Sequence, residues 1–299
     1  MGSDRRTFFN QLVNVGALSG LAAMLPSDAL AKVESSIQGE TPEVQLESGN
    51  DTTRTHTFHA HAHIFHSDTD HRLAHELGSQ RLIRLPEGGG FRSQFVDGHK
   101  SNGICFKSAY MHVAGTRSSK FGYGWVTLAT SVLTGLNVHG VVQADLVFAQ
   151  VSTEHPLEGY VPSVTFLGTR FENLRIGGRE AEPVFDLGIC GPKPESDKAY
   201  VQDAGFLSRV AQQYHGDAAR DAARVGQQGK VECSLVTHVA KTIPGTSFGH
   251  TIEVAGLGKV SLAKLAVDQA FHLTMVSVDS AQTGGVHFGG SGANGNTRP

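Results

Sequence analysis

The stretch Thr57-Phe58-His59-Ala60-His61-Ala62-His63-Ile64-Phe65 decides the fold class, because apolar and polar residues alternate along it. Alternation with a period of two is typical of a β-strand that is buried on one face only. The apolar residues of the stretch would face a core, and the opposite face would carry His59, His61 and His63. We therefore expect a strand at residues 57–65 that presents a row of imidazoles.

The rest of the chain repeats this β pattern, with Gly, Pro or Asn in nearly every gap. Short strands with turn signals between them favour an antiparallel sandwich or barrel. Residues 200–225 instead place apolar side chains at helical spacing, which predicts a helical insertion. Further strands are expected at residues 104–113, 125–133, 138–151, 163–176, 232–243, 250–254, 259–267 and 271–278. The predicted fold class is mainly β.

Composition excludes several classes of protein. The chain has 299 residues, 39% of them hydrophobic, and a formal net charge of −3. It is large enough to bury a core and is not disordered as a whole. The sequence pI of about 6.6 provides no basic field, so we expect no nucleic-acid partner. Cys105, Cys190 and Cys233 are few and widely spaced, which favours three buried thiols over a disulfide framework, although one bridge and a free thiol would also fit.

The first 31 residues have the three parts of a bacterial export signal. Arg5-Arg6 forms a positive start, an apolar run covers residues 12–25, and Asp28-Ala29-Leu30-Ala31 ends in small residues. The arginine pair followed by Phe8-Phe9 resembles a twin-arginine signal. The predicted location is therefore periplasmic or extracellular, and no later segment is apolar enough to span a membrane.

The predicted organisation has four parts. Residues 1–31 are the signal peptide and residues 32–55 a flexible linker. Residues 56–283 form one β-rich domain with the helical insertion. Residues 284–299, which contain Gly-Gly, Gly-Gly-Ser-Gly and Asn-Gly, are expected to form a disordered Gly-rich tail.

The candidate metal ligands are His59, His61, His63 and His66. Same-face neighbours on a strand lie about 7 Å apart, so adjacent imidazoles of such a row can share one ion. Neutral imidazole suits Zn or Cu. A solvated His-rich edge strand without a metal would give the same pattern.

The candidate catalytic residues are the carboxylates Asp145, Glu154 and Glu158. Glycosidases need two carboxyl groups across a cleft, about 5 to 9.5 Å apart. The sequence does not show which of the three converge, and solvated surface charges are the alternative.

Two stretches carry a family resemblance. Residues 124–145 (GWVTLATSVLTGLNVHGVVQAD) and 161–178 (VPSVTFLGTRFENLRIGG) resemble secreted bacterial β-rich proteins, a group that includes the choice-of-anchor surface domains. The resemblance implies a location and a fold class, and it implies no catalytic residue.

Three functions follow as hypotheses. The first is an exported β-rich protein that binds an extracellular ligand, such as a glycan or a cell surface, or has a structural role. The second is a metal-dependent hydrolase or oxidase that uses the His-x-His-x-His strand. The third is a carbohydrate-active enzyme with paired carboxylates. Whether the protein is an enzyme stays open at this point.

Overall fold

The computed structural model describes residues 55–69, 71–119, 123–157, 159–195, 198–214, 229–241, 243–247, 249–280 and 284–298. Strands make up most of this part of the chain, and the helices are short. The elements are β1 (Thr55–Ser67), α4 (Arg72–Leu77), β2 (Leu82–Arg84), β3 (Gly90–Ser101), β4 (Ile104–Arg117), β5 (Tyr123–Val138), β6 (Val142–Pro156), β7 (Ser163–Thr165), β8 (Arg170–Glu172), β9 (Arg175–Ile176), β10 (Arg179–Glu180), β11 (Pro183–Phe185), α5 (Ala204–Ala211), β12 (Val231–Ser234), β13 (Val236–Val239), β14 (Thr246–Ser247), β15 (Thr251–Val254), β16 (Gly258–Val267), β17 (Phe271–Ser280) and β18 (Gly284–Arg298), with 3-10 turns at Gly78–Arg81 and Tyr200–Gln202.

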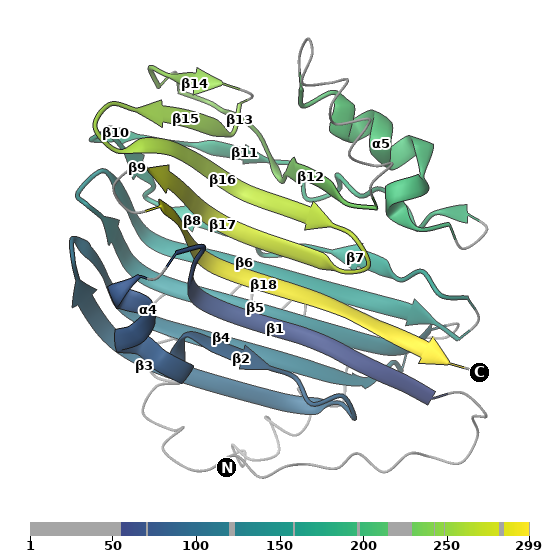
Figure 1. The fold of residues 1–299 in the computed structure, drawn as a ribbon. Coiled ribbons are helices and arrows are strands. Elements are labelled where there is room, and N and C mark those ends of the chain that lie inside the picture. The colour runs from purple at the N-terminus through teal and green to yellow at the C-terminus, as the bar shows by residue number, and fades with distance from the viewer. Residues whose placement is uncertain are drawn as a thin grey trace, which may run out of the picture.

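Most of the strands form two large antiparallel sheets that pack face to face (Figure 1), and β11 pairs with β13 in a small separate sheet. Sheet A has the order β14-β15-β16-β17-β18-β1-β2, with β12 also paired to β16. Sheet B has the order β10-β9-β6-β5-β4-β3, with β7 and β8 also paired to β6. Strands β1, β17 and β18 of sheet A lie over β4, β5 and β6 of sheet B. The prediction of a mainly β sandwich is confirmed, and the described strands do not close into a barrel.

The core lies between the two inner faces. Apolar residues at alternate positions of β1 meet those of β4, β5 and β6, as the period-two pattern predicts. The largest side chains that are fully buried include Ile64, Met111, Leu133 and Phe288. The alternation of residues 57–65 therefore does place one face of β1 in the core and leaves the histidine face on the outside of sheet A.

The last strand overturns one prediction. The sequence pattern of residues 284–299 predicts a disordered tail, yet Gly284–Arg298 is strand β18. β18 pairs with β1 on one side and with β17 on the other, so it is an interior strand of sheet A. The glycine-rich composition hid a period-two pattern, in which Val286 and Phe288 point into the core and are fully buried. The β-rich part of the chain therefore extends past residue 283.

The helical insertion is confirmed in part. α5 begins at the predicted place, because the Asp203 side chain accepts a hydrogen bond of 2.6 Å from the backbone N–H of Phe206. The predicted segment extends to residue 225, and residues 215–228 lie outside the described residues. Within the described ranges, no helix is long and apolar enough to cross a membrane.

Several strand boundaries also differ from the prediction. β3 was not expected, because the three consecutive glycines at residues 88–90 favour a loop. The expected strand at 163–176 is three short strands, β7 to β9, which all pair with β6. Cys105, Cys190 and Cys233 are free thiols, and the last two are buried. The predictions for residues 1–54, the signal and most of the linker, lie outside the described residues.

A break in the alternation of sheet A changes which side chains share a face. The β1–β18 ladder pairs His63 with Gly290 and Phe65 with Phe288, and it is interrupted between them at Ile64 and Gly289. Gly289 has φ +64°, in the left-handed region. Ile64 and Phe65 are consequently both buried, although they are neighbours in sequence. Beyond the break, the outward positions shift by one residue, so His66 lies on the same outer face as His63.

Because of this break, we expect that replacing Gly289 by a residue with a side chain destabilises the fold. A left-handed backbone costs about 1–2 kcal/mol for a residue with a Cβ, and that Cβ would lie 3.0 Å from Val147 Cγ1. Gly289→Ala is therefore expected to lower the free energy of unfolding by about 1–2 kcal/mol in a urea titration. Gly88→Ala is the matched control, because a Cβ at position 88 would have no neighbouring atom within 4 Å. Equal stability of the two variants would contradict this account of the break.

Candidate functional site

Five imidazoles form a continuous line across the outer face of sheet A. They come from three neighbouring strands. The line consists of His272 on β17, His61, His63 and His66 on β1, and His287 on β18. We call this set the histidine line.

Successive rings of the histidine line are close neighbours. The ring centroids of His272 and His61 are 5.3 Å apart, and those of His61 and His63 are 6.1 Å apart. His63 and His66 follow at 6.1 Å, and His66 and His287 at 5.8 Å. Imidazoles at these separations can bind one ion between neighbours, because ring nitrogens coordinate at about 2.0–2.1 Å.

The glycines of β18 make room for the two central rings. Gly292 pairs with His61 and Gly290 with His63 across the β1–β18 ladder. A Cβ on either glycine would overlap the imidazole of its partner. The rings can therefore lie down on the backbone of β18, which a side chain at position 290 or 292 would prevent.

Burial and mutual repulsion favour the neutral form of His61, His63 and His272. Desolvation, together with repulsion from the other histidines of the line, lowers the pKa of His63 to about 3. Desolvation also lowers the pKa of His61 to about 4, with contributions from His272 and Arg84. The pKa of His272 is lowered by the same burial. A neutral imidazole has an unprotonated nitrogen, which is the form that binds a metal.

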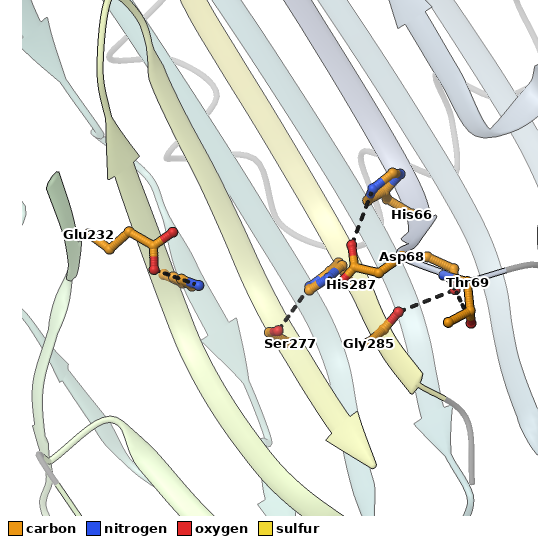
Figure 2. A network of polar contacts seen from close by, with 9 residues as sticks. His66, Asp68, Thr69, Glu232, Ser277, Gly285 and His287 are labelled. Carbon is orange, nitrogen blue, oxygen red and sulfur yellow. Dashed lines mark hydrogen bonds and ion pairs between the residues drawn. The ribbon is translucent and has the colours of Figure 1, made fainter. Parts of the chain in front are cut away.

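A carboxylate lies at each end of the line. At the β17 end, His272 Nε2 is 3.7 Å from Asp268 Oδ1. At the other end, Asp68 lies between two imidazoles: His287 Nε2 is 3.2 Å from Oδ2, and His66 Nε2 is 3.7 Å from Oδ1. Figure 2 shows this second group, with His287 also joined to Ser277 on β17.

Three of the four predicted metal ligands lie close together in the structure, and the fourth lies apart. It brings His61, His63 and His66 together in the histidine line. His59 is exposed on the same strand, and no ring contact of the described residues joins it to the line. Within the described ranges, no group of three or more His, Cys, Asp or Glu side chains is already arranged to hold a metal ion.

The structure places Asp145 and Glu154 too far apart to form a catalytic pair with each other. Asp145 and Glu154 both lie on β6, nine residues apart. A strand rises about 3.3 Å per residue, so they are separated by roughly 30 Å, far beyond a glycosidase pair. Asp145 is exposed and accepts a hydrogen bond of 2.7 Å from Asn173. Glu158 lies outside the described residues.

Sequence reasoning missed two members of the line, His272 and His287. Each is a lone histidine more than 200 residues from the row on β1, and His287 lies in the segment expected to be a tail. The signal that could have found His287 is the alternation of Val286 and Phe288 around it, which marks it as an outward position of a strand.

A second cluster of histidines lies inside the sandwich. His56 stacks on Trp125 with centroids 4.8 Å apart, and the His155 ring lies 4.8 Å from His56. His155, Thr127 and Thr153 are fully buried on the inner face of sheet B. Both ring nitrogens of His155 and the two threonine hydroxyls have no hydrogen-bond partner in the structure. The cluster was not predicted from the sequence.

Comparison with known proteins identifies a family and no activity. Residues 56–224 and 207–268 match the model of a family described as Domain of unknown function (DUF8256), so the chain belongs to that family. No curated protein matches the chain, and no solved structure matches it. The resemblance to secreted surface domains stays a prediction.

Burial of histidines away from the line predicts acid sensitivity. Burial lowers the pKa of His155 to about 3, aided by His56 and Lys193, and burial lowers the pKa of His112 to about 4. In the unfolded chain these groups take up protons below about pH 6.5, whereas the native state resists protonation. The free energy of unfolding should therefore fall as the pH decreases from about 6.5 towards 4.

Replacing one buried histidine tests whether these side chains cause the acid sensitivity. His155→Gln cannot titrate, so the slope of unfolding free energy against pH should decrease by up to about 1.4 kcal/mol per pH unit. Denaturant titrations at several pH values between about 7 and 4.5 measure this slope. His238→Gln, at an exposed position, is the control. An unchanged slope in His155→Gln would show that His155 is not a source of the acid sensitivity.

Proposed function

We propose that this DUF8256 protein is an extracytoplasmic binding protein, and that its ligand is a transition-metal ion bound on the histidine line. The location rests on the export-type pattern of residues 1–31. The binding role rests on one observation above all. Five imidazoles from three strands meet at ring separations of 5.3 to 6.1 Å on one outer face.

The chemistry of the line fits Zn(II) or Cu(II). Both ions prefer neutral imidazole among protein ligands. The lowered pKa values of His61 and His63 mean that no proton has to be displaced from these rings near pH 7. A surface that binds a glycan would instead be expected to offer large aromatic rings, and the rings of this line are all imidazoles.

The line would hold an ion between two neighbouring imidazoles, with a carboxylate or solvent as further ligands. This follows from the spacing of successive rings and from the absence of a closed cluster among the described residues. Two or three protein ligands leave a position open to solvent, which suits reversible binding, whereas structural zinc sites use four protein ligands. The proposed role is therefore capture and release of metal ions outside the cytoplasm, and it includes no catalytic step.

Titration of the untagged protein with zinc or copper tests the proposal. Isothermal titration calorimetry at about pH 7.5, in a buffer that does not coordinate metals, is expected to show saturable binding. The double variant His61→Ala/His66→Ala leaves no two neighbouring imidazoles in the line and should weaken the binding at least tenfold, about 1.4 kcal/mol. Absence of saturable binding by the unaltered chain would refute the proposed function.

His59→Ala provides the matched control. It removes an imidazole from the same strand and the same face, but not from the line, and should change the affinity less than about twofold. Circular dichroism of both variants verifies that the sheets are retained. If His59→Ala weakens binding as much as the double variant His61→Ala/His66→Ala, the metal affinity comes from histidine content and not from the line.

A further inference from the structure

We infer that the primary metal site of the histidine line is the corner formed by His66, Asp68 and His287, and that Ser277 positions His287 for it. This inference rests on the proposed function and deepens it, since it assigns the site to one end of the line. It adds to two imidazoles a carboxylate ligand from the end of the same strand as His66 and a hydroxyl partner from β17.

The distances in this corner match those between ligands of one ion. Ligand atoms at 2.0–2.1 Å from a tetrahedral zinc ion are separated by about 3.3 Å. His287 Nε2 and Asp68 Oδ2 are 3.2 Å apart, and His66 Nε2 and Asp68 Oδ1 are 3.7 Å apart. Each of the two imidazole nitrogens thus lies at nearly the required spacing from one oxygen of the same carboxylate.

The corner can close around an ion with little movement of the backbone. The His66 and Asp68 side chains are 56% and 59% exposed, so both can turn, whereas His287 is only 17% exposed. His287 is thus the ordered ligand, and the other two can adjust to the ion. Rotation of the His66 and Asp68 side chains would let all three ligands bind the same metal ion, although they do not surround a common point in the structure.

The backbone places Asp68 over β18 by specific contacts. The Asp68 N–H donates to the carbonyl oxygen of Gly285 at 3.0 Å, and the Ser67 hydroxyl donates to the same oxygen at 3.2 Å. A Cβ at position 285 would overlap the Asp68 carboxylate. A side chain at position 285 would therefore displace the Asp68 carboxylate from its present place beside His287.

Ser277 holds the far side of the same imidazole. Its hydroxyl is 2.8 Å from His287 Nδ1, and Ser277 is itself 2% exposed. Figure 2 draws this contact as a dashed line between the two side chains. A hydroxyl can donate or accept a hydrogen bond. Without metal, Ser277 can donate to Nδ1 while Nε2–H donates to Asp68. With metal on Nε2, the proton resides on Nδ1 and donates to Ser277. Partners of this kind orient metal-binding imidazoles and commonly change affinity 10–100-fold.

Zinc titrations of corner variants test the assignment. His287→Ala and Asp68→Asn are each expected to weaken zinc binding at least tenfold. Ser277→Ala should weaken it about tenfold, and Ser277→Thr, which keeps the hydroxyl, should restore it. Ser261→Ala is the matched control, because Ser261 is the cross-strand partner of Ser277 on β16 and is 8% exposed. It should change the affinity less than about twofold.

The tautomer of His287 gives a readout that a merely structural serine would not affect. Nitrogen-15 NMR should show the proton of His287 on Nε2 in metal-free protein and on Nδ1 at saturating zinc. A proton that stays on Nε2 would overturn the assignment of this ring as a ligand.

The outcomes separate this inference from the proposed function. If zinc binds and only His61→Ala and His272→Ala weaken it, the corner assignment is wrong and the function of the line stands. If the unaltered chain does not bind zinc or copper, both fail. If Ser277→Ala and Ser277→Thr weaken binding equally, Ser277 is not a positioning residue.

Discussion

The pairing of β18 between β1 and β17 is the interaction on which the rest of the molecule depends. It joins the first strand of the described fold to the hairpins of the second half through two ladders of backbone hydrogen bonds. Without β18, β1 and β2 would have no bonded connection to β12 and β14–β17 among the described strands. The inner faces of β1 and β18 together also cover the centre of sheet B, so the core requires the same strand.

The histidine line is a product of that pairing and of the composition of β18. Imidazoles on β1 alone would stand apart on an outer face. Glycines at 290 and 292 let the rings of His63 and His61 lie down on the sheet, and the resulting burial keeps them neutral. The left-handed Gly289 then shifts the outward positions, which brings His66 and His287 to the same face. The glycine-rich stretch of β18, whose sequence favours a disordered tail, thus allows the imidazoles of the histidine line to lie next to one another.

Local patterns predicted the fold class well and the site incompletely. The strict alternation of residues 57–65 was enough to place one face of β1 in the core, and Asp203 was enough to begin α5. The prediction for Gly284 to Arg298 was wrong because propensity for a strand is weak in glycine, and tertiary pairing overrides it here. His272 and His287 could not be assigned from the sequence, because their nearness to β1 depends on pairings across more than 200 residues. Asp145 and Glu154 lie nine residues apart on the extended strand β6, which is too far for the two carboxylates to act together. A catalytic role that involves Glu158 stays a prediction.

The order of the strands in sheet A has a consequence for synthesis. The strand that begins the described fold, β1, has its main partner at the C-terminal end of the chain, Gly284–Arg298. On a ribosome, β1 therefore emerges long before the strand that completes its sheet. Contacts of such long sequence separation are slow to form, and the edge of β1 that pairs with β18 stays unpaired until β18 has been made. An export route that accepts only folded cargo would therefore transport this protein only after β18 has been made and inserted into the sheet.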